Sequence, residues 1–152
     1  TPAEVYRALI EATAFGALTI IRQFESFGCK VEQVINCGGI AEKNDLLMQT
    51  YADVCNRPMK TSRSAETCAL GAAIFGAVVG GAYESVEKAQ DAMTGVKDKV
   101  YKPRKKAVEV YAELYKLYRR LHDGFGNVEE TKPDIQRLMK DLIDLRDRVR
   151  AG

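Results

Sequence analysis

The sequence predicts a helix-rich α/β fold with two short strands flanked by long helices. A short apolar run at Val31, Val34 and Ile35 is typical of a buried strand, and a paired-glycine turn and a helical pattern follow it. A second strand pattern spans residues 59–61. Most of the remaining chain repeats apolar residues every three or four positions, which indicates amphipathic helices.

The first helix is predicted to begin at the start of the sequence. Residues 1–4 form a capping box with proline at the first helical position. The helix is expected to run up to Gly28. Its predicted buried face consists of Val5, Leu9, Ala12, Phe15 or Gly16, Phe24 and Phe27.

The second helix is predicted to begin after Asn44, which is a good N-cap residue. Asp45 lies in its first turn, where a carboxylate favours the helix dipole. Asp53 shares a helix face with Gln49, and this pattern indicates a polar or surface role. The apolar positions of this helix are Leu47, Tyr51, Val54 and Cys55.

A third helix is predicted from an apolar stretch at residues 68–83 that is rich in Ala and Gly. The stretch is shorter than the ~20 residues of a bilayer span, so we expect a buried helix. Gly71, Gly76 and Gly80 each cost roughly 1 kcal/mol of helix propensity relative to alanine. That cost favours close packing against a sheet or against the paired-glycine turn.

The last third of the chain is predicted to be mainly helical. Ser85 can cap a short helix that ends at Met93, and residues 100–103 are expected to be extended before the proline. A helix is predicted from Arg104 to His122, with a break at residues 124–127. We expect His122, the only histidine, to be an ordinary residue near the end of that helix.

A final amphipathic helix is expected from Pro133, with Ile135, Leu138, Leu142, Leu145 and Val149 on its apolar face. The predicted organisation is therefore a domain over residues 1–122, followed by a linker and this helix over 123–152.

Composition limits the classes of function. The chain has 152 residues, 46% hydrophobic and 29% charged, which suits one globular domain. A net charge of +2 indicates no nucleic-acid and no membrane partner. The basic cluster at residues 97–106 lacks interleaved aromatic residues, which favours a solvated face. Four cysteines without C-x-x-C spacing predict reduced, buried thiols in a cytoplasmic protein, with no metal: Cys29, Cys37, Cys55 and Cys68.

Gly38 and Gly39 form the candidate site, because they lie between a strand pattern and a helix pattern. Glycines let a ligand approach the backbone closely, and a helix start offers unpaired N–H groups, as in nucleotide phosphate sites. The same two glycines are also compatible with a plain tight turn.

The ordered series GGIAEKN at residues 38–44, MQ…ADV.NRP at 48–58 and CALGAAIF at 68–75 resembles FGGY carbohydrate kinases. Within that family, the residues of these three segments are most similar to those of the L-ribulokinases. The resemblance covers about residues 1–118, and its specific core runs from 36 to 75. It implies part of an actin/hexokinase-like (ribonuclease H-like) nucleotide-binding domain.

The resemblance also implies ATP and Mg²⁺ as cofactors and ribulose as the sugar substrate, with a possible homo-oligomer. In the family the catalytic base is an aspartate upstream of the position of Thr1, so the chain is expected to be the C-terminal part of a kinase and inactive alone. No catalytic residue is assigned here. The expected nucleotide-binding residues are Gly38, Gly39, Lys43 and Asn44.

Two of these assignments have alternatives. Lys43 stands four positions after the second glycine, where related kinases often carry asparagine near adenine or ribose, and it is also compatible with solvent exposure. Asn44 is equally explained by N-capping. For the whole chain, the alternatives are xylulokinase or glycerol kinase chemistry and a non-catalytic helical interaction module.

Overall fold

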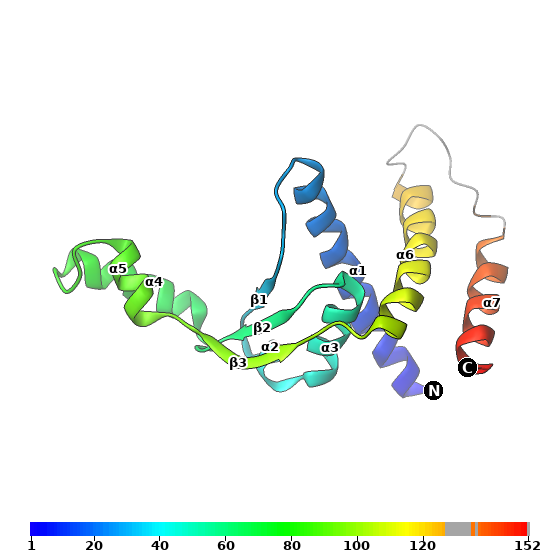
Figure 1. The fold of residues 1–152 in the computed structure, drawn as a ribbon, viewed down its shortest axis with the longest axis horizontal. Coiled ribbons are helices and arrows are strands. Elements are labelled where there is room, and N and C mark those ends of the chain that lie inside the picture. The colour runs from blue at the N-terminus through cyan, green and yellow to red at the C-terminus, as the bar shows by residue number, and fades with distance from the viewer. Residues whose placement is uncertain (127–134, 136, 152) are drawn as a thin grey trace.

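A computed structural model describes residues 1–126, 135 and 137–151 (Figure 1). A small three-stranded sheet lies among the helices of the described chain. The elements are α1 (Pro2–Ser26), β1 (Val34–Asn36), α2 (Gly39–Lys43), α3 (Asp45–Cys55), β2 (Met59–Ser62), α4 (Thr67–Val79), α5 (Val86–Met93), β3 (Val96–Tyr101), α6 (Lys105–Gly126) and α7 (Leu138–Ala151).

The sheet has the order β1-β2-β3. β1 and β2 are parallel, with Val34 opposite Met59, and α2 and α3 form the crossover between them. β2 and β3 are antiparallel, with Lys60 opposite Val100. The helix-rich α/β prediction is confirmed, and β3 adds a third strand to the two predicted. Its extended end was expected, but its pairing with β2 joins residues far apart in sequence.

Three predicted helix caps, at Thr1, Asn44 and Ser85, are confirmed in atomic detail. Thr1 Oγ1 accepts a hydrogen bond from the Glu4 N–H at 3.3 Å, and the Glu4 carboxylate accepts from the Thr1 ammonium at 2.7 Å. The Asn44 side chain caps α3, and the Ser85 hydroxyl accepts from the Lys88 N–H to cap α5.

The predicted buried face of α1 is wrong at most positions. Val5, Leu9, Phe24 and Phe27 are 61%, 64%, 56% and 82% exposed. The helix carries apolar residues around most of its circumference, and α3 and α6 cover the side opposite these four. The residues that are buried instead are Ile10, Ala14, Phe15, Leu18 and Ile21.

An aromatic cluster forms the contact between α1 and α6. The Phe15 ring lies 5.3 Å from the Tyr118 ring, 5.9 Å from the Tyr115 ring and 6.2 Å from the Tyr111 ring, centroid to centroid. Helix α3 completes the core with buried apolar side chains that include Met48.

Two further expectations of burial are wrong. Ile35 on β1 is 50% exposed, because β1 is an edge strand of a small sheet. Helix α4 buries only Ile74 among its described side chains, and Val79 is 90% exposed. A Cβ at Gly71 or Gly76 would meet nothing within 4 Å, so these glycines make no close contact.

Helix α4 packs against α5, and the pair projects away from the sheet at the left of Figure 1. Within the described residues, no helix combines the length and the apolar character needed to cross a membrane.

The predicted break after α6 is misplaced, because α6 continues to Gly126. Asn127 and Pro133 lie outside the described residues. Helix α7 packs against α6 with Leu138 and Leu145 buried, and Arg120 Nη1 lies 2.7 Å from Asp141 Oδ2 across the contact.

The predicted burial of the cysteines holds for Cys55 alone. The other three are exposed, and all four are free thiols: Cys29, Cys37, Cys55 and Cys68. Burial raises the pKa of the Cys55 thiol from its usual 9.0 to about 11.

The Cys55 thiol is therefore expected to make folding stability fall at alkaline pH. The unfolded chain loses this proton first, so the contribution is intact below pH 9.0 and is lost as the pH rises towards about 11. The loss reaches up to about 2–3 kcal/mol. Urea unfolding of the parent and of Cys55→Ala between pH 8 and pH 11 measures it, and equal pH slopes for the two proteins would contradict it.

Candidate functional site

The paired glycines lie just beyond the carboxyl end of β1. Gly38 is the N-cap of α2 with φ +90°, a value that favours glycine, and Gly39 is the first residue of α2. The positive φ therefore belongs to Gly38. The second predicted helix does begin after Asn44, as α3, but the sequence had not predicted the short helix α2, which starts at Gly39 itself and ends at Lys43.

The backbone at this turn is open. Gly39 is exposed, and a Cβ at Gly38 or Gly39 would meet nothing within 4 Å. The Glu42 N–H is the first to bond within α2, to the Gly38 carbonyl at 3.2 Å. The N–H groups of residues 39–41 therefore have no acceptor inside the helix, as at any helix start. Because α2 has little more than one turn, these N–H groups, rather than a long helix dipole, would attract an anion.

The two polar residues assigned to the site differ in their surroundings. Lys43 is exposed at the end of α2 and forms no ion pair with any described residue. Both polar atoms of the Asn44 side-chain amide have hydrogen-bond partners. Its Oδ1 accepts from the Leu47 N–H at 3.0 Å, and its Nδ2 donates to the Tyr6 hydroxyl at 3.0 Å. These bonds give Asn44 a capping role and tie α3 to α1.

Strand β3 fixes the position of α2 and of the start of α3. Lys97 pairs with Glu42, and Lys99 Nζ lies 2.8 Å from Asp45 Oδ2. The Tyr101 hydroxyl donates to Asp45 Oδ1 at 2.6 Å. The hydrogen bonds from Lys99 and Tyr101 hold the pKa of Asp45 below its usual value. Asp45 thus joins α3 to the sheet, in addition to its place in the first helical turn.

Asp53 was expected to have a polar or surface role, but its side chain is fully buried. Its carboxylate accepts from the Arg104 side chain at 2.6 and 3.0 Å, from the Arg104 backbone N–H at 2.8 Å and from Gln49 Nε2 at 3.0 Å. Asp53 therefore joins α3 to the start of α6. The shared face with Gln49 was visible in the sequence, but the Arg104 partner lies too far along the chain to be inferred.

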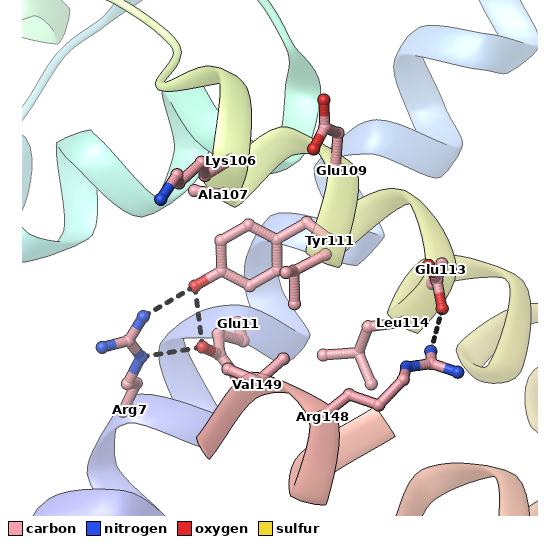
Figure 2. Close-up of a pocket in the computed structure, with 11 residues that line it drawn as sticks. Arg7, Glu11, Lys106, Ala107, Glu109, Tyr111, Glu113, Leu114, Arg148 and Val149 are labelled. Atoms are coloured by element: carbon pink, nitrogen blue, oxygen red, sulfur yellow. Dashed lines mark hydrogen bonds and ion pairs between the residues drawn. The ribbon is translucent and has the colours of Figure 1, made fainter. Parts of the chain in front are cut away.

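A hollow of about 800 Å³ lies between α1, α6 and α7 (Figure 2). In it, the Tyr111 hydroxyl accepts from Arg7 Nη2 at 3.1 Å and donates to Glu11 Oε1 at 2.8 Å. Arg148 pairs with Glu113 at another part of the rim. Sequence reasoning did not single out this cluster, which consists of residues from three helices.

Burial raises the pKa of Tyr111, and the Glu11 hydrogen bond adds to the effect, so the hydroxyl stays protonated and keeps donating. The hydrogen bond to Glu11 also raises the pKa of Arg7. The three polar groups thus satisfy one another, and this arrangement ties α1 to α6. None of the four sequence-assigned site residues lines the hollow.

His122 lies within α6 beside Asp123, with Nδ1 2.9 Å from Asp123 Oδ1. Asp123 also pairs with Arg119 at 2.9 Å. Its contacts with His122 and Arg119 hold the pKa of Asp123 below its usual value.

A family model and individual known sequences point to the same family of proteins. Residues 1–79 match the model of the FGGY family of carbohydrate kinases, C-terminal domain. A ribulokinase from Halalkalibacterium halodurans is 43% identical over 151 residues, which is 97% of this chain and 26% of that protein. A ribulokinase from Geobacillus thermodenitrificans is 46% identical over 155 residues, again 26% of its length. The chain thus spans about a quarter of these relatives.

Solved structures share the fold. A xylulose kinase from Rhodospirillum rubrum has a TM-score of 0.66 at 24% identity, covering 80% of this chain and 24% of that one. A gluconate kinase from Lactobacillus acidophilus has a TM-score of 0.65 at 24% identity, covering 81% of this chain and 24% of its own. Both likenesses support the predicted fold class.

Proposed function

Because this chain belongs to the FGGY family of carbohydrate kinases, we propose that it supplies part of the ATP-binding lobe of a kinase that phosphorylates ribulose. The intact enzyme would transfer the γ-phosphoryl group of Mg-ATP to a sugar hydroxyl. The observation that carries the proposal is the open Gly38-Gly39 turn beyond the carboxyl end of parallel strand β1. In open sheets with parallel strands, ligands bind at such carboxyl ends.

The surroundings of the turn fit a nucleotide. The free N–H groups at the start of α2 suit phosphate oxygens, and both glycines lack the Cβ that would hold a ligand away. Lys43 is the exposed cation closest in sequence, and its ammonium group suits phosphate or ribose oxygens. ATP would supply the transferred phosphoryl group, and Mg²⁺ would neutralise its charge. We assign no magnesium ligand and no catalytic base to the described residues.

Ribulose is favoured as the sugar because relatives that are 40–46% identical to this chain are ribulokinases. The xylulose kinase is only 24% identical to this chain over the aligned residues, so its name is a weaker guide. The sugar contacts themselves would come from the rest of the intact enzyme, and the chain alone is expected to be inactive.

A chimera tests this proposal. Residues 1–152 replace the matching region of the Halalkalibacterium halodurans ribulokinase, and coupled ADP release is measured with ribulose and Mg-ATP. The chimera is expected to turn over. Gly39→Val should then raise the KM for ATP by about tenfold or more, while the KM for ribulose changes little. The reason is that the new side chain enters open space that the nucleotide would occupy.

The controls distinguish a variant that has lost contact with the nucleotide from one that no longer folds stably. Gly39→Ala should give a smaller rise than Gly39→Val, because the added side chain is smaller. Both variants should melt like the parent chimera, whereas Gly38→Ala should melt lower because Gly38 has φ +90°. An unchanged ATP KM in folded Gly39→Val would leave the glycine pair as a plain turn.

A further inference from the structure

Helix α2, which begins at the glycine turn, is weakly held by its own residues. It has five residues, and only Ala41 among them is buried, while Ile40 is 70% exposed. A helix of little more than one turn is unstable alone, because few hydrogen bonds offset the entropy lost in ordering it. Contacts from outside must therefore fix the direction of α2 and of the turn at Gly38 and Gly39.

Strand β3 supplies a polar contact of this kind. Lys97 forms an ion pair with Glu42, whose side chain is 34% exposed. Of the side-chain hydrogen bonds and ion pairs between described residues, this is the only one that joins α2 itself to the sheet. Lys99 and Tyr101, further along β3, both bind Asp45 and so hold the start of α3 instead.

The pairing of β3 with β2 is irregular where Lys97 lies. Lys60 of β2 is opposite Val100, but Ser62 is opposite Val96, so the register shifts between these positions. Residues 97–99 therefore lie in an irregular part of the strand, as in β-bulges, which change the direction in which side chains leave a strand. It is from this part of β3 that Lys97 reaches Glu42.

The contact is charged at neutral pH and reaches the glycine turn in one further step. The hydrogen bond from Lys97 holds the pKa of Glu42 below its usual value, so the side chain is a carboxylate. The backbone N–H of Glu42 donates to the Gly38 carbonyl at 3.2 Å. A displacement of Glu42 therefore disturbs Gly38, because that bond joins the two residues directly.

We propose that Lys97 is a positioning residue for the nucleotide: its ion pair with Glu42 holds α2, and with it the Gly38-Gly39 turn, in the orientation that binds ATP. Lys97 acts through Glu42 and does not touch ATP. The nucleotide role rests on the proposed function, whereas the hold on α2 exists without nucleotide.

Steady-state kinetics of the ribulokinase chimera measure the effect. Lys97→Met and Glu42→Gln should each raise the KM for ATP by about three- to fivefold, as expected from the loss of one partly exposed ion pair. The kcat and the KM for ribulose should change little, because the fold and the sugar contacts remain. Lys97→Arg keeps the ion pair and should match the parent chimera.

The sign of the Glu42→Gln effect separates positioning from a direct role of charge. If Lys97 attracted the phosphates by its own charge, removal of the neighbouring carboxylate would lower the KM for ATP, while Lys97→Met would raise it. A positioning pair instead predicts increases from both changes. It also predicts that the double variant matches either single variant, because each change removes the same interaction.

Lys88→Met is the matched control. Lys88 also pairs with a glutamate, Glu84, and its replacement changes the net charge equally. That pair lies at the start of α5, which projects away from the sheet with α4 (Figure 1). The KM for ATP of this variant should be that of the parent chimera.

Hydrogen exchange of the same proteins without nucleotide measures the stability of α2 directly. The Asn44 amide donates to the Ile40 carbonyl at 3.0 Å and so reports the opening of α2. It should exchange faster in Lys97→Met and in Glu42→Gln, but not in Lys97→Arg or Lys88→Met. Three results would overturn the role of Lys97: unchanged exchange at Asn44, opposite changes of KM in the two single variants, or additive effects in the double variant.

The positioning role and the nucleotide site can fail separately. An unchanged ATP KM in folded Gly39→Val overturns the nucleotide site, whatever the exchange of α2. Unchanged exchange in Lys97→Met overturns the role of Lys97, even where Gly39→Val raises the KM for ATP as expected.

Discussion

Asp53→Ala is expected to lower the free energy of unfolding by about 3–5 kcal/mol. The carboxylate is fully buried and accepts hydrogen bonds from the Arg104 side chain, the Arg104 backbone N–H and Gln49. Removal of the carboxylate leaves the backbone donor without its acceptor and a void between α3 and the start of α6. Both effects make the loss of stability larger than the loss of a surface ion pair would cause.

Chemical denaturation of the parent and the variant measures the loss. Asp53→Asn keeps the shape but presents an amide N–H₂ towards some of the same donors, so it should recover only part of the stability. Asp45→Ala is the matched control, because Asp45 is another carboxylate on α3 with lysine and tyrosine partners but a 71% exposed side chain. If Asp53→Ala lowers the free energy of unfolding no more than Asp45→Ala does, the buried contact between Asp53 and Arg104 contributes little to stability.

Phe15→Ala should have a similar effect, about 3–5 kcal/mol, because it empties the centre of the aromatic cluster between α1 and α6. Phe15 is 5% exposed, and its ring lies within 6.2 Å of the rings of three tyrosines, centroid to centroid. The helices cannot close fully over the missing ring, since Tyr111 is also held by its hydrogen bonds to Arg7 and Glu11.

Thermal and urea unfolding of Phe15→Ala, compared with Phe15→Leu, measures this effect. Leucine fills part of the volume of the Phe15 ring, so Phe15→Leu should lower the free energy of unfolding clearly less than Phe15→Ala does. Phe24→Ala is the control on the same helix, because Phe24 is 56% exposed. Equal losses for Phe15→Ala and Phe24→Ala would show that the described core does not depend on this cluster.

The candidate site was partly predictable from the sequence. The glycine pair after a strand was placed correctly, because glycines between a strand and a helix are a strong local signal. The sequence did not reveal that α2 separates the glycines from α3, or that the Asn44 amide also bonds to Tyr6. The roles of Gly38, Gly39, Lys43 and Asn44 towards nucleotide remain predictions, which the chimera tests.

Burial was the least predictable property. Val5 and Leu9 belong to one apolar face of α1 and Phe15 to another, and the chain packs only the second of these faces. The same difficulty affected α4, where an almost wholly apolar sequence gave no sign of which side would be covered. For Asp53 the error was the opposite one, because a residue expected to be polar or at the surface is buried. An aspartate is rarely buried unless a partner is supplied, and here the partner is Arg104 from far along the chain.

Local sequence is enough to place the starts of three helices, α1, α3 and α5. Thr1, Asn44 and Ser85 each cap through a bond to a residue three positions ahead, so the interaction is complete within one turn of chain. The tertiary structure alone decided that Val96–Tyr101 would form a strand with β2, that Asp53 would be buried against Arg104 and that one apolar face of α1 would stay exposed. The physical reason is that each of these outcomes depends on a partner distant in sequence, whose position is set only when the helices and the sheet pack together.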